Sequence, residues 1–188
     1  MSEHTDSDLL HRYLDGDDTG LERLVKRYQA DIYRFIYRMV GNEADAADLS
    51  QKVFVKLFLK AGTFQQQSSF KTWLFQIAVN QCKNHYRSND RRRIDDNQTD
   101  IERLGESGYD AIETYSCQEQ RKLLMNAVDK LPERQKATMK LRIQMDCTFK
   151  EIAEIMTISV GTAKAHYHQA VTSLKHCIKD NDYETHKM

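Results

Sequence analysis

Positively charged, amide and aromatic side chains gather between residues 64 and 93, a combination that suits contact with nucleic acid. The basic and amide residues recur on one face of a predicted helix and just beyond it: Lys83, Asn84, Arg87, Arg91, Arg92 and Arg93. The aromatic residues nearby are Phe64, Phe70, Trp73 and Tyr86. Cations hold a phosphate backbone, and aromatic faces stack on unpaired bases. A solvated helix end above core aromatic residues would show the same residues, so this segment alone favours neither interpretation.

Two short amphipathic patterns between residues 148 and 175 form a second candidate site. The first pattern starts with a capping box, Thr148 with Glu151, and a turn at residues 157–158 separates it from a second helix that Ser159 caps. This is the layout of a helix-turn-helix, although two packed helices of a bundle would look alike. The second helix directs outward the side chains that can reach base edges or phosphates: Thr162, Lys164, Ala165, His168, Gln169 and Thr172. With one lysine and no arginine on that face, we expect modest phosphate affinity.

The remaining reactive side chains indicate neither an enzyme nor a metal protein. The four cysteines are widely spaced and include no CxxC pair: Cys82, Cys117, Cys147 and Cys177. We interpret them as reduced thiols, because His85 and His176 would complete only two-ligand sites where structural zinc takes about four ligands. A redox or metal role for these cysteines stays open. The sequence has no glycine-rich phosphate loop and no nucleophile elbow, so we expect no cofactor and no catalytic activity.

The composition favours helices over strands. The 188 residues include one proline and seven glycines, with 40% hydrophobic and 30% charged residues. No apolar run reaches about 18 residues, and the N-terminus is polar and acidic without a secretory signal. We therefore expect an all-α protein that inserts into no membrane and stays in the cytoplasm.

The formal net charge is zero, but the charges are distributed unevenly along the chain. Residues 1–93 carry 15 basic and 12 acidic side chains, residues 117–180 carry 11 and 7, and residues 94–116 carry 1 and 7. The acidic stretch shows little periodic apolar pattern, so we expect a flexible linker there. The predicted organisation is two small helical domains, residues 1–94 and 117–180, joined by a linker over residues 95–116 and followed by a disordered tail over residues 181–188.

Apolar periodicity predicts the helices of the first domain. One apolar stripe ends at Gly41, and a second stripe is widened by Phe54 and Phe58. The members of the two stripes are Ile32, Phe35, Ile36 and Met39, and then Ala46, Leu49, Val53 and Leu57. A polar loop over residues 62–69 then precedes the helix over residues 73–87.

The second domain is less regular before its helix-turn-helix. A short amphipathic helix over residues 123–128 is expected to end near residue 131, and Pro132 fits the first turn of the helix that follows. Residues 137–145 alternate between apolar and polar side chains, which is the period of a strand. We still assign them to a helix, because a lone strand would have no partner.

Several segments, in order along nearly the whole chain, resemble the extracytoplasmic-function (ECF) sigma factors of bacterial RNA polymerase. Residues 45–58 (DAADLSQKVFVKLF) and 70–80 (FKTWLFQIAVN) resemble the first domain of that family. Residues 131–135 (LPERQ), 149–154 (FKEIAE) and 158–164 (ISVGTAK) resemble its second domain. Several motifs in register are more specific than a helix-turn-helix alone. The resemblance implies a protein that binds core polymerase, recognises and opens promoters, and starts transcription of genes that respond to stress or another signal.

The resemblance also implies roles for individual residues. Contacts to the β′ clamp helices of core polymerase would come from Asp45, Asp48, Leu49, Gln51, Lys52 and Phe54. Contacts to the −10 element, including a pocket for a flipped base, would come from Phe64, Ser68, Ser69, Phe70, Lys71, Trp73, Gln76, Asn80, Lys83, Asn84, Arg87 and Arg91. Contacts to the −35 element in the major groove would come from Ser159, Val160, Thr162, Lys164, Ala165, His168 and Gln169. Two positions depart from the family: Lys52 replaces a usual acid, and residues 166–169 (HYHQ) replace a more basic run.

The implied partners are core RNA polymerase (the β′ clamp helices and the β flap), promoter DNA and an anti-sigma factor. The acidic linker would enter the polymerase cleft, where its negative charge can mimic RNA, or would serve as a plain tether. The rival interpretation is a stand-alone helix-turn-helix regulator of transcription, with residues 1–93 as a sensor or dimerisation domain. The sequence determines neither the promoter sequence nor the inducing signal.

Overall fold

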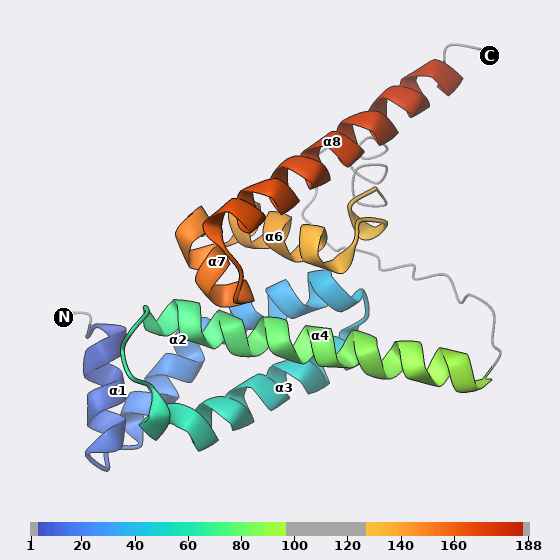
Figure 1. Cartoon of the computed structure of the whole chain (residues 1–188). Coiled ribbons are helices and arrows are strands. Elements are labelled where there is room, and N and C mark those ends of the chain that lie inside the picture. Colours follow the sequence, from blue (N-terminus) through green and yellow to red (C-terminus); the bar gives the residue numbers. More distant parts are fainter. Residues whose placement is uncertain (1–3, 97–126, 186–188) are drawn as a thin grey trace, which may run out of the picture. The chain divides into compact units, whose positions relative to one another are not determined.

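The computed structural model describes residues 4–96 and 127–185, which are helical throughout apart from short connections (Figure 1). The predicted all-α fold is confirmed over these residues, which contain no strand. The chain divides into two compact units within the stretch from residue 97 to 126. Most of the predicted linker and the predicted helix up to residue 126 therefore lie outside the described residues. None of the described helices has an apolar stretch of the length that a bilayer crossing requires.

The N-terminal unit consists of four α-helices and one short 3-10 helix. They are α1 (Asp6–Leu14), α2 (Thr19–Val40), α3 (Glu43–Lys60), η1 (Ala61–Thr63) and α4 (Phe70–Asp96). Helix α2 packs against α1, α3 and α4, and α3 also packs against α4 (Figure 1). The unit therefore surrounds α2, which is the helix with the most complete apolar stripe.

The helix ends of this unit follow local chemistry. Thr5 and Asp8 form a capping box at the start of α1. The predicted end of α2 at Gly41 is confirmed, with this residue in the left-handed region at φ 84°. Asn42 then caps α3, because its Oδ1 accepts from the Asp45 backbone N–H at 2.7 Å. Gly41 and Asn42 thus form a tight corner between α2 and α3.

The core is formed by the two predicted stripes. Ile32, Phe35 and Ile36 of α2 are fully buried, and Phe35 meets Phe75 of α4 edge to face with ring centroids 5.5 Å apart. The prediction that Phe58 widens the α3 stripe is wrong. Its side chain is 59% exposed on the outer side of α3, with its ring centroid 6.2 Å from that of Tyr13.

Hydrogen bonds from two residues of α2 to Asp6 hold helix α1 against α2. Asp6 accepts from Arg27 and from the Tyr28 hydroxyl, each at 2.5 Å. Burial, followed by the hydrogen bond to Asp6, raises the pKa of Tyr28 far above its ordinary value. Tyr28 therefore stays protonated and donates, which keeps α1 in place beside the aromatic residues described below.

The C-terminal unit contains α6 (Glu133–Gln144), α7 (Phe149–Met156) and α8 (Val160–Thr185), preceded by a helical turn over residues 127–129. The assignment of residues 137–145 to a helix is confirmed up to Gln144. Pro132 lies one position before the first turn, at the N-cap. The side chains that join α6 to α8 form a small apolar cluster: Ala127, Leu131, Met139, Ala170 and Leu174.

Two helices continue further than predicted. Helix α4 includes residues 95 and 96, which were expected to begin the linker, and α8 includes residues 181–185, which were expected to be disordered. Neither extension contains a proline or a glycine, so nothing in the backbone chemistry ends the helix earlier.

Candidate nucleic-acid interface

An aromatic cluster lies where the loop after η1 enters α4. Phe64 lies 4.9 Å from Trp73 and 6.1 Å from Phe70, measured between ring centroids. Phe70 is buried and also faces Tyr28 at 5.7 Å, whereas Phe64 and Trp73 are half-buried. The buried ring therefore supports the cluster, and the two half-buried rings are the ones that offer a face to a ligand.

The entry into α4 is fixed by Ser69. Its hydroxyl accepts from the Thr72 backbone N–H at 3.1 Å and lies 2.8 Å from the Thr72 hydroxyl. This is the geometry of an N-cap, so the predicted DNA contact at Ser69 also has a structural task. Ser68, one residue earlier, is half-buried, and Lys71 and Gln76 are half-buried on α4.

The polar face of α4 continues from the aromatic cluster along the helix. Four of its predicted residues are exposed and lie on one side, at the spacing of successive turns: Asn80, Lys83, Asn84 and Arg87. Residues 70–89 contain no aspartate or glutamate. The side chain of Arg91 lies outside the described part of the chain. Over residues 70–89 the face therefore presents positive charge and amide groups without an acid, and Asp90 is the first acid of α4.

The predicted polymerase-binding residues of α3 differ in exposure. Asp48 and Lys52 are exposed and pair with each other at 2.5 Å, and Gln51 is exposed between them. Phe54 is half-buried. Leu49 is 4% exposed, so it belongs to the core and supports the helix from inside.

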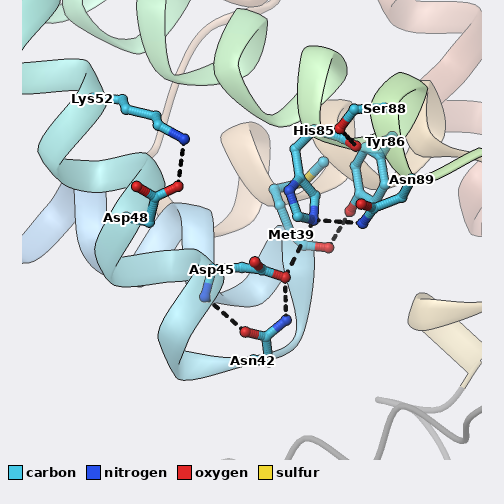
Figure 2. A network of polar contacts seen from close by, with 9 residues as sticks. All are labelled: Met39, Asn42, Asp45, Asp48, Lys52, His85, Tyr86, Ser88 and Asn89. Atoms are coloured by element: carbon cyan, nitrogen blue, oxygen red, sulfur yellow. Dashed lines mark hydrogen bonds and ion pairs between the residues drawn. The ribbon is translucent and has the colours of Figure 1, made fainter. Parts of the chain in front are cut away.

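Asp45 is held within the chain. Its Oδ2 accepts from Asn42 Nδ2 at 2.5 Å and lies 3.3 Å from His85 Nε2 of α4, as Figure 2 shows. Asn89 Nδ2 lies 2.9 Å from the same histidine nitrogen. From the sequence, His85 was considered only as part of a two-ligand metal site, and Asn89 had no predicted role.

Sequence reasoning also missed an exposed apolar surface on α3. Val55, Phe58 and Leu59 are 51%, 59% and 70% exposed. Only Phe58 had been assigned a position, and that position was the core. The available signal was that apolar residues on α3 exceed what one buried stripe needs.

The second candidate site has the predicted helix-turn-helix geometry. Glu151 accepts from the Thr148 N–H at 2.7 Å, which completes the capping box of α7. The turn passes through Thr157 at φ 56°, and Ser159 Oγ accepts from the Thr162 N–H at 3.0 Å at the start of α8. Ala163 is fully buried where α8 packs on the unit.

The outward side of α8 carries the predicted DNA contacts. Val160 is 41% exposed, and Lys164, Ala165, His168 and Gln169 are exposed. Residues 157–176 contain no acid. Gln169 also accepts a hydrogen bond from Gln135 at 3.3 Å, which ties this side of α8 to α6. This surface resembles that of α4 in having no acid, but it holds fewer cations.

Within the described residues, no three histidine, cysteine or carboxylate side chains gather as a metal site would require. Cys82 and Cys147 are buried and form no disulfide, and Cys117 lies outside the described residues. The side chain of Cys177 is not among those described either.

Comparison with known proteins matches both units to families. Residues 24–92 match the model of sigma-70 region 2, and residues 121–174 match that of sigma-70 region 4. The ECF RNA polymerase sigma-E factor of Escherichia coli K12 is 31% identical over 178 residues, covering 90% of this chain and 93% of that protein. The RNA polymerase sigma-H factor of Pseudomonas aeruginosa is 29% identical over 177 residues, covering 90% of this chain and 92% of that protein.

Two solved structures share the fold at lower identity. The sigma factor RpoE of Bartonella quintana, solved with the anti-sigma factor NepR, has a TM-score of 0.73 at 20% identity and covers 84% of this chain and 96% of its own. CnrH, solved with the cytosolic domain of CnrY, has a TM-score of 0.69 at 17% identity. The match covers 93% of this chain and 97% of CnrH.

Proposed function

Because the chain belongs to the extracytoplasmic-function family of RNA polymerase sigma factors, we propose that its helices divide the tasks of promoter recognition between them. A sigma factor binds core RNA polymerase, directs it to a promoter and begins transcription there. We assign −10 recognition to α4 with the aromatic cluster, polymerase docking to α3, and −35 recognition to α8. These assignments correspond to functional domains over residues 1–94 and 117–180.

The exposed face of α4 within residues 70–89, a stretch without acids next to two half-buried aromatic rings, is the observation that carries the −10 assignment. Lys83 and Arg87 would hold the phosphate backbone, and Phe64 and Trp73 would stack on bases that have left the duplex. Asn80 would hydrogen-bond a base in the pocket, because an amide offers both a donor and an acceptor. Unstacking a base costs a few kcal/mol, and these contacts would offset that cost.

Polymerase docking is assigned to the exposed side of α3. Its pair of Asp48 and Lys52, together with Gln51, offers polar contacts to the β′ clamp helices, and the exposed apolar Val55 and Phe58 extend the surface. The C-terminal unit would contact the β flap while α8 lies in the major groove of the −35 element.

Further roles follow from family membership. We propose that the acidic segment over residues 95–116 enters the polymerase cleft, that an anti-sigma factor binds the chain, and that the protein acts in the cytoplasm. We also propose that the chain catalyses no reaction itself and that polymerase supplies the chemistry. The relatives' names do not identify which genes this chain controls.

The decisive experiment measures run-off transcription with and without core polymerase. The purified chain alone is expected to bind a promoter fragment weakly, and to give a discrete transcript once core polymerase is added. Tight, sequence-specific binding without polymerase would instead favour a stand-alone regulator. Asn80→Ala should reduce promoter opening, detected by permanganate reactivity of unpaired thymines, while core binding stays unchanged. Unchanged opening would contradict the pocket assignment.

The −35 assignment has its own test. Replacing Lys164 and His168 with alanine should alter the preference among −35 sequences and leave the preference among −10 sequences unchanged. Transcription from promoter libraries randomised at each element measures both preferences at once. A shift in −10 preference would contradict the division between α8 and α4.

A further inference from the structure

Figure 2 shows polar contacts around His85 that join the first turn of α3 to α4, and the roles proposed above do not use His85. His85 Nε2 lies between two partners, 3.3 Å from Asp45 Oδ2 and 2.9 Å from Asn89 Nδ2. Asp45 is also held from the other side by Asn42, the N-cap of α3. One histidine of α4 therefore reaches the residues that begin α3.

Hydrogen-bond chemistry fixes the roles within this network. The Asp45 carboxylate offers only acceptors, so the His85 nitrogen facing it must carry a proton. The same nitrogen cannot then accept from an amide N–H. The oxygen and nitrogen of an asparagine amide are nearly indistinguishable in shape. A flip of the Asn89 amide places its Oδ1 toward the proton on His85 Nε2. A proton on His85 Nε2 thus points toward the Asp45 carboxylate, which lies within ion-pair distance at 3.3 Å.

The neighbouring residue of α4 fixes the other side of the same corner. The Tyr86 hydroxyl donates to the backbone carbonyl of Met39, near the end of α2. Gly41 separates these two attachment points and has no side chain to restrain it. Two successive residues of α4 therefore hold the end of α2 and the start of α3.

Exposure supports a role for this pair beyond that of a surface ion pair. The His85 side chain is only 12% exposed, whereas that of Asp45 is 40% exposed. An ion pair with one partner largely removed from solvent has a better-defined geometry than one between two mobile surface side chains. The direction of the first turn of α3 is consequently set by α4.

We propose that His85 is a positioning residue for polymerase docking, which acts through Asp45 to fix the start of α3. This inference rests on the docking face proposed for α3, since Asp48 and Lys52 follow Asp45 on the same helix. Asp45 then serves inside the chain and does not itself contact polymerase. Because α4 also carries the −10 face, the same bond links the two surfaces that core polymerase and DNA would occupy.

The test is the affinity of the full-length chain for core polymerase, measured by titrating core enzyme into fluorescently labelled chain. His85→Leu keeps comparable bulk but removes the donor, and we expect about tenfold weaker binding, the size of effect that hydrogen bonds to charged groups produce. His85→Gln retains an N–H donor and should restore most of the affinity. A purely space-filling role would show the opposite order, because leucine is the better apolar filler.

A double-mutant cycle decides whether the two residues act together. Asp45→Ala should weaken binding as much as His85→Leu, and the double variant should be no weaker than either single variant. Asp31→Ala is the matched control, since it removes a carboxylate of α2 that is 38% exposed and pairs with Arg34. That control should leave core affinity unchanged.

Two results would overturn the inference: additive losses in the double variant, or a His85→Gln variant as weak as His85→Leu. The variant Gln51→Ala distinguishes failure of the positioning role of His85 from failure of the docking assignment to α3. If Gln51→Ala leaves core binding unchanged, the α3 face is wrong and the positioning role falls with it. If Gln51→Ala weakens binding while His85→Leu and Asp45→Ala do not, only the positioning role is wrong. Urea unfolding verifies that each variant is folded, and the comparison relies on Asp45→Ala if His85→Leu does not fold.

Discussion

The salt dependence of promoter binding tests the α4 face directly. Each cation that neutralises a phosphate releases counterions, and for single-stranded DNA it contributes about 0.7 to the slope of log affinity against log salt. Lys83 and Arg87 are both exposed on this face of α4. Replacing both with alanine should therefore lower the slope by about 1.4. Between roughly 50 and 200 mM salt, that difference amounts to about a sevenfold smaller loss of affinity.

The assay uses holoenzyme formed with the full-length chain and a fluorescein-labelled fork DNA whose non-template −10 strand is unpaired. Because only the sigma chain changes, contacts from polymerase cancel when the slopes are subtracted. Asn80→Ala should lower affinity at every salt concentration but leave the slope unchanged, since it removes no charge. Lys26→Ala is the matched control, because Lys26 is an exposed lysine of α2 that pairs with Glu22 and is not among the proposed α4 contacts. An unchanged slope in the double variant would refute the proposed contact of α4 with the phosphate backbone.

Two further predictions concern the scaffold. Gly41→Ala should reduce the free energy of unfolding by urea by about 1–2 kcal/mol, the cost of a side chain in the left-handed region, because φ is 84° at this position. A Cβ there meets nothing within 4 Å, so no steric clash adds to that cost. Gly62→Ala, at a position without positive φ, should be close to neutral. A hydrogen bond from the Thr19 hydroxyl, followed by one from Arg12, lowers the pKa of Asp17 below its ordinary value of 3.8. Its stabilising contribution is therefore complete above that value and lost as pH falls below it, so Asp17→Asn should destabilise the chain at pH 6 and much less near pH 3 in thermal unfolding.

Local patterns predicted the parts of the fold that depend on local chemistry. The stripe from Ile32 to Met39 is buried as expected, and Gly41 ends that helix because it takes a conformation that other residues avoid. The capping box at Thr148 and the cap at Ser159 were identifiable because each needs only two or three neighbouring residues. Such features require no knowledge of the rest of the chain.

The parts that the sequence did not predict depend on contacts between distant segments. Helix α1 was not identified, because its short polar-rich stretch becomes stable only when Asp6 meets Arg27 and Tyr28, more than 20 residues away. Phe58 was misplaced because periodicity gives the side of a helix but not whether a neighbour covers it. The pairing of His85 with Asp45 likewise spans 40 residues and leaves no local signal.

The zero net charge of the chain does not prevent the proposed DNA binding, because a phosphate responds to nearby charges. At 0.1 M salt the screening length is about 10 Å, so acids elsewhere on the chain contribute little at either face. What matters is that residues 70–89 and 157–176 each contain no acid. Each face still holds few cations, which limits what either could achieve alone. If the proposed faces bind DNA, joining two weak, locally positive surfaces on one polymerase would supply the promoter affinity. Binding of the first surface raises the effective concentration of the second.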